Sequence, residues 1–233
     1  MGFRLHRKRL LTPSHTLATV YWFNDGADAN WATHTDNWWS DALHTTPLGA
    51  APIAADDVVT VGDPGTGPEV DLDAWTEPAS IDASATGITF TSAAATALGI
   101  AVTGDCTFNG DAESDAVTGD CTFNDTSSNG GAITGDATFN DTARAAADVS
   151  GTATFNDTAY NDATISGDAV FHDTSHNDAT VSGTATFNDS SYNQGAVGNG
   201  ATFNHQSQNR AQITGGVTFP GYGINGSAIL GMP

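Results

Sequence analysis

Phenylalanine recurs along the chain at a fixed spacing of sixteen residues. After Phe123 it returns at Phe139, Phe155, Phe171, Phe187, Phe203 and Phe219, and Phe108 precedes this series one residue out of step. A fixed period of this length is the sequence signature of a solenoid, in which every repeat forms one coil. A single coil cannot bury its own phenylalanine, so the core forms only when coils stack about 4.8 Å apart.

Three other positions of the repeat are apolar or small and alternate with polar residues. In the repeat that ends at Phe155, these positions are Val149, Gly151 and Ala153. Because alternate side chains of a strand point to opposite faces, we expect the four positions to share the inward face. An Asn-Asp-Thr turn follows each phenylalanine, and a second short strand such as residues 163–165 leads into the next coil. The pattern predicts about two strands per coil and an all-β fold, a parallel β-solenoid with 16-residue coils and an irregular N-terminal cap.

The sequence divides into four segments. Residues 1–18 form a basic arm, residues 19–101 a Trp-rich cap with irregular first coils, residues 102–220 the repeats, and residues 221–233 an apolar tail that leaves the period. In the second segment, residues 58–61, 69–72 and 87–90 read as strands separated by a Gly- and Pro-rich stretch. Solenoids need atypical ends, because an open coil exposes its core and its unpaired strand edges.

Charge is distributed very unevenly along the chain. The formal net charge is -21, yet four of the six basic residues, Arg4, Arg7, Lys8 and Arg9, lie in the first nine. The remaining body should repel nucleic acid, and no apolar run is long enough for a transmembrane segment. We expect a homo-oligomer or polymer in which the basic arm, together with Ile229 and Leu230 of the uncharged tail, contacts other subunits.

Stacking turns each repeat position into a column, and one of these columns is acidic. Its members are Asp125, Asp141, Asp157, Asp173 and Asp189. Like charges about 5 Å apart repel by roughly 0.9 kcal/mol in water, and a divalent cation would relieve that repulsion. The column is therefore a candidate calcium site, and no other cofactor is expected. The alternative is a column of solvated turns in which each carboxylate accepts local backbone amides.

Other columns allow further interpretations. Tyr160, His176 and Tyr192 form an aromatic strip that fits either carbohydrate binding or a surface ladder. A column of Asn residues suggests stacked amides, and outward Thr residues resemble the arrays of ice-binding proteins, although Val170 interrupts them. For catalysis the nearest cluster is Asp173 with His172 and His176, but no nucleophile or phosphate loop accompanies it. We therefore predict no catalytic residues and no enzyme.

The leading segment contains Tyr21-Trp22, Asn37-Trp38, Pro52 and Asp56-Asp57-Val58, and the repeats follow it. In these motifs it is similar to the leading segment of many bacterial and phage β-solenoid proteins. The resemblance implies an extracellular, cell-surface or virion-surface fibrous protein.

These observations favour a non-enzymatic structural protein, a self-assembling subunit of an extracellular filament or surface fibre. Eight phenylalanine coils span only about 34 Å at the usual strand spacing, so a long fibre requires copies to join. The alternatives are a phage tail-fibre or adhesin module that binds carbohydrate, and an ice-binding or polysaccharide-degrading β-helix.

Overall fold

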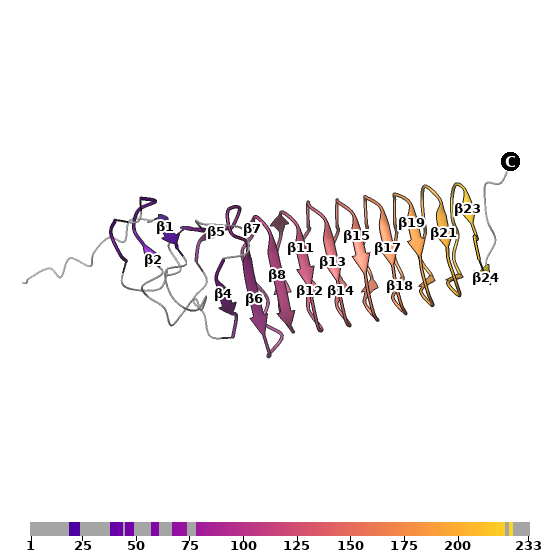
Figure 1. The fold of residues 1–233 in the computed structure, drawn as a ribbon, viewed down its shortest axis with the longest axis horizontal. Helices are drawn as coiled ribbons and strands as arrows, with labels where there is room; N and C mark the ends of the chain where they lie inside the picture. The colour runs from indigo at the N-terminus through magenta and orange to yellow at the C-terminus, as the bar shows by residue number, and fades with distance from the viewer. Residues whose placement is uncertain are drawn as a thin grey trace, which may run out of the picture.

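The computed structural model describes residues 19–23, 38–43, 45–48, 57–60, 67–73 and 78–221, and the backbone of Ile224–Asn225. These ranges contain β-strands and no helix, hence none that could cross a membrane. The strands stack along one axis into an elongated parallel β-solenoid (Figure 1), which confirms the predicted fold class. We call this stack of coils the rod.

Three sheets run along the rod, and each coil from Val102 onward contributes to all three. Sheet A consists, in order, of β2 (Trp38–Trp39), β1 (Thr19–Trp22), β3 (Asp57–Thr60), β5 (Ser80–Asp82), β7 (Val102–Thr103) and β10 (Val117–Thr118). Sheet B consists of β4 (Glu69–Asp71), β6 (Ile88–Ser92), β8 (Cys106–Gly110), β11 (Cys121–Phe123), β13 (Ala137–Phe139), β15 (Ala153–Phe155), β17 (Ala169–Phe171), β19 (Ala185–Phe187), β21 (Ala201–Phe203) and β23 (Val217–Thr218). Sheet C consists of β9 (Glu113–Ser114), β12 (Ser128–Asn129), β14 (Arg144–Ala145), β16 (Tyr160–Asn161), β18 (His176–Asn177), β20 (Tyr192–Asn193), β22 (Gln208–Asn209) and β24 (Ile224–Asn225).

The regular coils have two strands each, for example β15 and β16, as the sequence predicted, and a third side that it did not predict. Beyond β10, sheet A continues as single-residue bridges, such as Val149 to Ile165, and the chain then bends before the phenylalanine strand begins. The aliphatic residue and the phenylalanine therefore lie in different sheets. Glycine stands at the corner between them: a β carbon on Gly151 would come closer to the carbonyl oxygen of Gly135 than van der Waals contact allows. The glycine serves close coil packing there.

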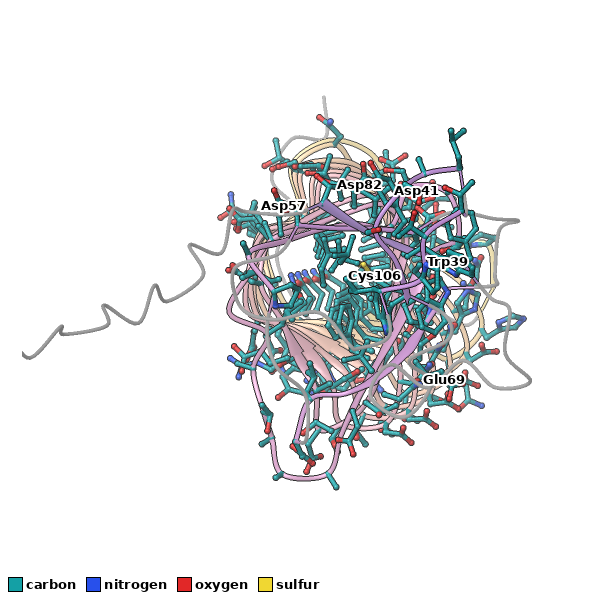
Figure 2. All side chains as sticks on the ribbon, turned by 90° about the vertical axis from the view of Figure 1, so that its left-hand side faces the viewer. Trp39, Asp41, Asp57, Glu69, Asp82 and Cys106 are labelled. Atoms are coloured by element: carbon teal, nitrogen blue, oxygen red, sulfur yellow. The ribbon has the colours of Figure 1, made fainter. Side chains whose placement is uncertain are left out.

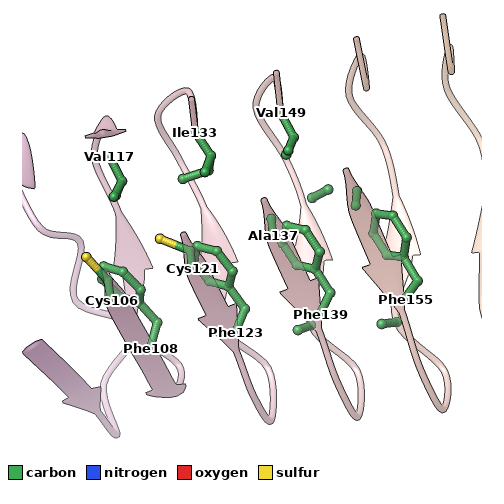
Figure 3. Packing of buried hydrophobic residues seen from close by; sticks show 14 of the residues in the cluster. Cys106, Phe108, Val117, Cys121, Phe123, Ile133, Ala137, Phe139, Val149 and Phe155 are labelled. Atoms are coloured by element: carbon green, nitrogen blue, oxygen red, sulfur yellow. The ribbon is translucent and has the colours of Figure 1, made fainter. Parts of the chain in front are cut away.

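The interior is built from columns of identical side chains. The phenylalanine rings from Phe123 to Phe203 stack with centroids 4.7 to 4.9 Å apart and planes within 8° of parallel. All of them are completely buried. Figure 3 shows this column facing Val117, Ile133 and Val149 of sheet A, with Ala137 beside it. The column begins earlier than its period suggested, because Phe90 of β6 stacks on Phe108 at 4.9 Å.

The coils before the repeats are longer but share the same core. Val20 pairs with Val58, Val58 with Ile81, and Ile81 with Val102, so the coil length falls from 38 to 23 and then 21 residues before the regular spacing begins. At the outer edge of sheet A, β2 runs antiparallel to β1 and ends the parallel stack. Trp22 and Trp38 are both buried there, with rings edge to face at 5.0 Å.

The period continues past the point where the sequence seemed to abandon it. Strand β24 pairs in parallel with β22, placing Ile224 beside Gln208 and Asn225 beside Asn209. The expectation that residues 221–233 leave the period is therefore wrong at least as far as Asn225. Val217 and Phe219, the last sheet B core residues, are only partly buried.

Candidate functional site

The acidic column lies at the turn between sheets B and C. Asp125, Asp141, Asp157, Asp173 and Asp189 all have a left-handed backbone with φ between 55° and 60°. Aspartate tolerates this conformation better than most residues. Each carboxylate accepts an amide from the preceding coil: the Asp141 amide nitrogen, for instance, lies 3.3 Å from Asp157 Oδ2. The sequence predicted such an acceptor role from local amides, whereas the amides come from neighbouring coils.

This geometry leaves one carboxylate oxygen per coil for other partners. The described residues hold no group of three or more His, Cys, Asp or Glu side chains suited to a metal ion. Calcium usually takes six to eight oxygen ligands, so a cation on this column would need water for most of its shell. Calcium binding stays a prediction.

The aromatic strip on sheet C forms a closed stack. The Tyr160 and His176 rings are 5.3 Å apart and 5° from parallel, and His176 and Tyr192 are 4.7 Å and 7° apart. Arg144 lies over the far side of Tyr160 at 5.9 Å, and Arg210 lies over Tyr192 at 4.5 Å. Every ring face thus has a neighbour in the stack, so sugar rings cannot stack on these faces without displacing one. The arrangement fits a surface ladder better than a carbohydrate platform.

The two arginines are the only basic residues after Arg9. Arg144 Nη2 lies 2.9 Å from Asp162 Oδ2, and Arg210 Nη2 donates to Gln208 Oε1 at 2.9 Å. Both ends of the stack are therefore positioned by polar neighbours as well as by aromatic contact.

The cluster considered for catalysis does not converge. His172 replaces an asparagine in an outer amide ladder, where Nδ1 lies 3.4 Å from Asn188 Nδ2. Asp173 accepts the Asp157 amide at 3.2 Å, and His176 belongs to the aromatic stack. The three residues have separate partners in separate columns.

A second amide ladder is entirely internal. Asn161 Nδ2 donates to Asn177 Oδ1 at 2.7 Å, and Asn177 donates in turn to Asn193 at 2.8 Å. Ala145 interrupts the column, and Asn129 there donates to the Ala147 carbonyl at 2.7 Å instead. These buried groups are satisfied by one another, as an internal polar column requires.

The two cysteines are adjacent on the rod. Cys106 of β8 and Cys121 of β11 are free, buried and in register. Figure 3 shows their side chains pointing the same way into the core. A hydrogen bond with Cys121, together with burial, raises the pKa of the Cys106 thiol well above its usual value. Both side chains are buried in the core, which fits a packing role.

A groove that the sequence did not suggest runs over the start of sheet B. Its volume is about 460 Å³. Among its lining residues are Asp105, Asp120 and Asp136 with Thr107, Thr122 and Thr138, and no basic side chain. One oxygen of Asp120 accepts the Asp136 amide at 2.8 Å, so this acidic row, like the other, ties coil to coil. Figure 2, viewed along the rod, shows Cys106 in the interior and acidic residues such as Asp57, Asp82 and Glu69 at the periphery.

The sequence reasoning missed a change in surface charge near the C-terminal end. All 27 acidic residues precede residue 190. In the last described coils these positions no longer carry an acid: His205 follows the five aspartates of the left-handed turn, with φ 55°, and its Nδ1 lies 3.6 Å from Asp189 Oδ1. Comparing each column along the rod would have revealed this change.

The predicted subunit contacts lie outside the described residues. Arg4, Arg7, Lys8 and Arg9 belong to residues 1–18, and Ile229 and Leu230 to residues 226–233. Comparison with protein-family models, curated proteins and solved structures found no match to this chain.

Proposed function

We propose that this protein is a non-enzymatic structural subunit, a stiff β-solenoid rod that joins other copies into an extracellular filament or a fibre on a cell or virion surface. The resemblance of its leading segment to bacterial and phage β-solenoid proteins motivates the location. Several repeated polar positions, including the turn aspartates and the inner asparagines, bond from coil to coil, which supports a stiff spacer. Such a rod sets a fixed distance and direction between its two ends, and this role needs no catalytic group.

One observation carries the assembly part of the proposal. The last described coil has no acidic residue, and its core residues Val217 and Phe219 are only partly buried. Elsewhere the rod is densely acidic, and two such surfaces repel each other. An end without acidic residues and with partly exposed apolar residues is the part of the described rod that another acidic copy can approach at the lowest electrostatic cost.

The amino-terminal side of the described rod differs in kind. There an antiparallel strand, β2, lies outside β1, and two buried tryptophans cover the core. Solenoids with one such covered end and one end free of acidic residues have a polarity, and contacts through the end without acidic residues should dominate assembly.

Restoring acid to the last coil tests the proposal. The double variant His205→Asp with Gln212→Asp places aspartate where earlier coils have it. Asp189 stands at the repeat position of His205, and Asp148 stands at that of Gln212. Both side chains are exposed, so folding should be preserved. We expect light scattering and electron microscopy to show end-joined rods for the wild type and dispersed rods for the variant at low salt. Because the distance beyond which salt screens surface charges falls from about 10 Å at 0.1 M to about 3 Å at 1 M, association should return near 0.5 M salt.

A matched control places the same charge elsewhere. Ala146→Asp with Thr152→Asp adds two carboxylates at exposed positions of the central coils, next to coils that already carry Asp162 and Asp136. This variant should associate like the wild type. Equal association of all three proteins would exclude the C-terminal end as the contact, and a wild type that is monomeric at every concentration would refute self-assembly.

A further inference from the structure

The only two cysteines of the chain lie on neighbouring coils, at the point where the repeat becomes regular. Phe90 and Phe108 are eighteen residues apart, Phe108 and Phe123 are fifteen apart, and every later pair is sixteen apart. Cys106 and Cys121 each stand two residues before a phenylalanine of the fifteen-residue pair, and the next five coils have alanine at this position. The two cysteines therefore mark the junction between the irregular and the regular coils.

Main-chain hydrogen bonds hold the two cysteines in register. They pair directly in the parallel ladder of β8 and β11. The Cys106 amide donates to the Asp120 carbonyl at 2.9 Å, and the Cys121 amide donates to the Asp136 carbonyl at 2.9 Å. Neighbouring strands lie about 4.8 Å apart, and a disulfide needs its α carbons about 4.4 to 6.8 Å apart. The backbone thus already holds the pair at a distance that a disulfide can bridge.

Each of the two thiols has only the other as a thiol neighbour. Ile88 pairs with Cys106 on one side, and Ala137 pairs with Cys121 on the other. The two side chains point the same way in Figure 3. Both residues also belong to the lining of the groove over the start of sheet B, so a small reagent approaches them from that side.

We propose that Cys106 and Cys121 are joined by a disulfide when the protein meets an oxidising environment, and that this bond staples the short coil at the junction. The bond closes the loop between the two residues, which restricts the unfolded chain. Extracellular surroundings, as in the proposed function, allow such bonds to persist. The bond does not depend on assembly of the rod, which the proposed function assigns to the C-terminal end.

The oxidant for this step is a small disulfide such as oxidised glutathione. One cysteine loses its proton, and its thiolate attacks the small disulfide, which forms a mixed disulfide and releases one small thiolate. The thiolate of the second cysteine then attacks the protein sulfur and expels the other small thiolate. Two cysteine thiols are oxidised, one small disulfide is reduced, and the released thiolates take up the two protons. A hydrogen bond with Cys121, together with burial, raises the pKa of the Cys106 thiol, so the reaction should be faster at alkaline pH.

Oxidation of the full chain tests the proposal. The protein is treated with oxidised glutathione at about pH 8.5, both folded and during refolding from urea, which supplies the oxidant before the core closes. Intact mass, thiol titration after unfolding and peptide mapping identify the products. We expect a monomer that has lost two hydrogen atoms and contains a peptide linking Cys106 to Cys121. Its Tm should exceed that of the same protein after reduction by about 3 to 6 °C.

Two kinds of variant make the result specific. Cys106→Ala and Cys121→Ala each supply the alanine of the later coils, so they should fold like the wild type and show no change in Tm on oxidation. A displaced pair, Cys121→Ala with Ala137→Cys, puts the two thiols two coils apart. At about 9.6 Å they are too far apart to bond in the folded rod, so the folded variant should stay reduced.

Several results would overturn the proposal. These are thiols that stay free in both wild-type preparations, a bond between two molecules, and equal bridging of the displaced pair in the folded rod. A disulfide that forms but leaves the Tm unchanged would overturn its role as a staple.

Discussion

The central coils and the last described coils have the same interior and different surfaces. Between Phe123 and Phe219 the inward residues barely change: Val197 and Ile213 continue the aliphatic column, and Asn209 continues the buried amide ladder. The outward turn position changes from aspartate to His205. The backbone is left-handed at the aspartates and also at His205, so folding does not require the change. Inward residues are therefore set by the fold, whereas outward residues can change with what the rod contacts.

The largest expected difference between the two regions is in the phenylalanine column. Phe155 is completely buried between two rings, so Phe155→Ala should reduce the free energy of unfolding by about 3 to 5 kcal/mol. Phe219 is only partly buried and stacks on Phe203 at 5.2 Å with an 18° tilt. We expect Phe219→Ala to lose less than half as much in denaturant unfolding.

The outward neighbour serves as the control for this pair. Thr154→Ala, adjacent to Phe155 on the other face of β15, should change stability by less than about 0.5 kcal/mol. Equal losses for Phe155→Ala and Phe219→Ala would mean that the last coil is covered as fully as the central ones.

A smaller effect is expected in the buried amide ladder. Asn177 accepts from Asn161 and donates both to Asn193 and to the Ala179 carbonyl, at 2.9 Å. Asn177→Ala resembles the natural interruption at Ala145, where the preceding asparagine turns to a carbonyl. If Asn161 turns in the same way, the free energy of unfolding measured in urea should fall by about 1 kcal/mol. A loss of about 3 kcal/mol would show that the central coils cannot make this adjustment.

The fold was predictable because the stack repeats one coil conformation many times. The sixteen-residue spacing of Phe123 and Phe139 implied stacked coils, and the structure has them. The third side was missed because a strand that bends at glycine keeps its two-residue alternation. Sequence alone therefore cannot tell a single strand through Val149 and Phe155 from two strands joined at a corner. The close approach of Gly135 to Gly151 at this corner exists only between coils.

The candidate site was less predictable because its chemistry depends on where each side chain points. The rings of Tyr160 and Tyr192 were visible as a strip, but whether their faces or edges meet solvent follows from side-chain packing along the axis. The partners of the acidic column were likewise invisible, because each amide comes from the coil before. The tail was misread for the opposite reason: its apolar residues drew attention away from the spacing that Asn225 maintains.

The smallest expected effect concerns calcium on the acidic column, which only the central coils possess. With one free oxygen per coil, a dissociation constant of about 1 mM is the strongest binding we expect. At about 1 mM calcium such a site stabilises the fold by about 0.4 kcal/mol, a shift in Tm of roughly one degree relative to EDTA. The variant Asp141→Asn with Asp157→Asn keeps side-chain acceptors for the neighbouring amides and removes two charges, so it should abolish even this shift. A rise of several degrees that the variant eliminates would instead establish the column as a calcium site. The charge difference between central and last coils would then also be a difference in metal binding.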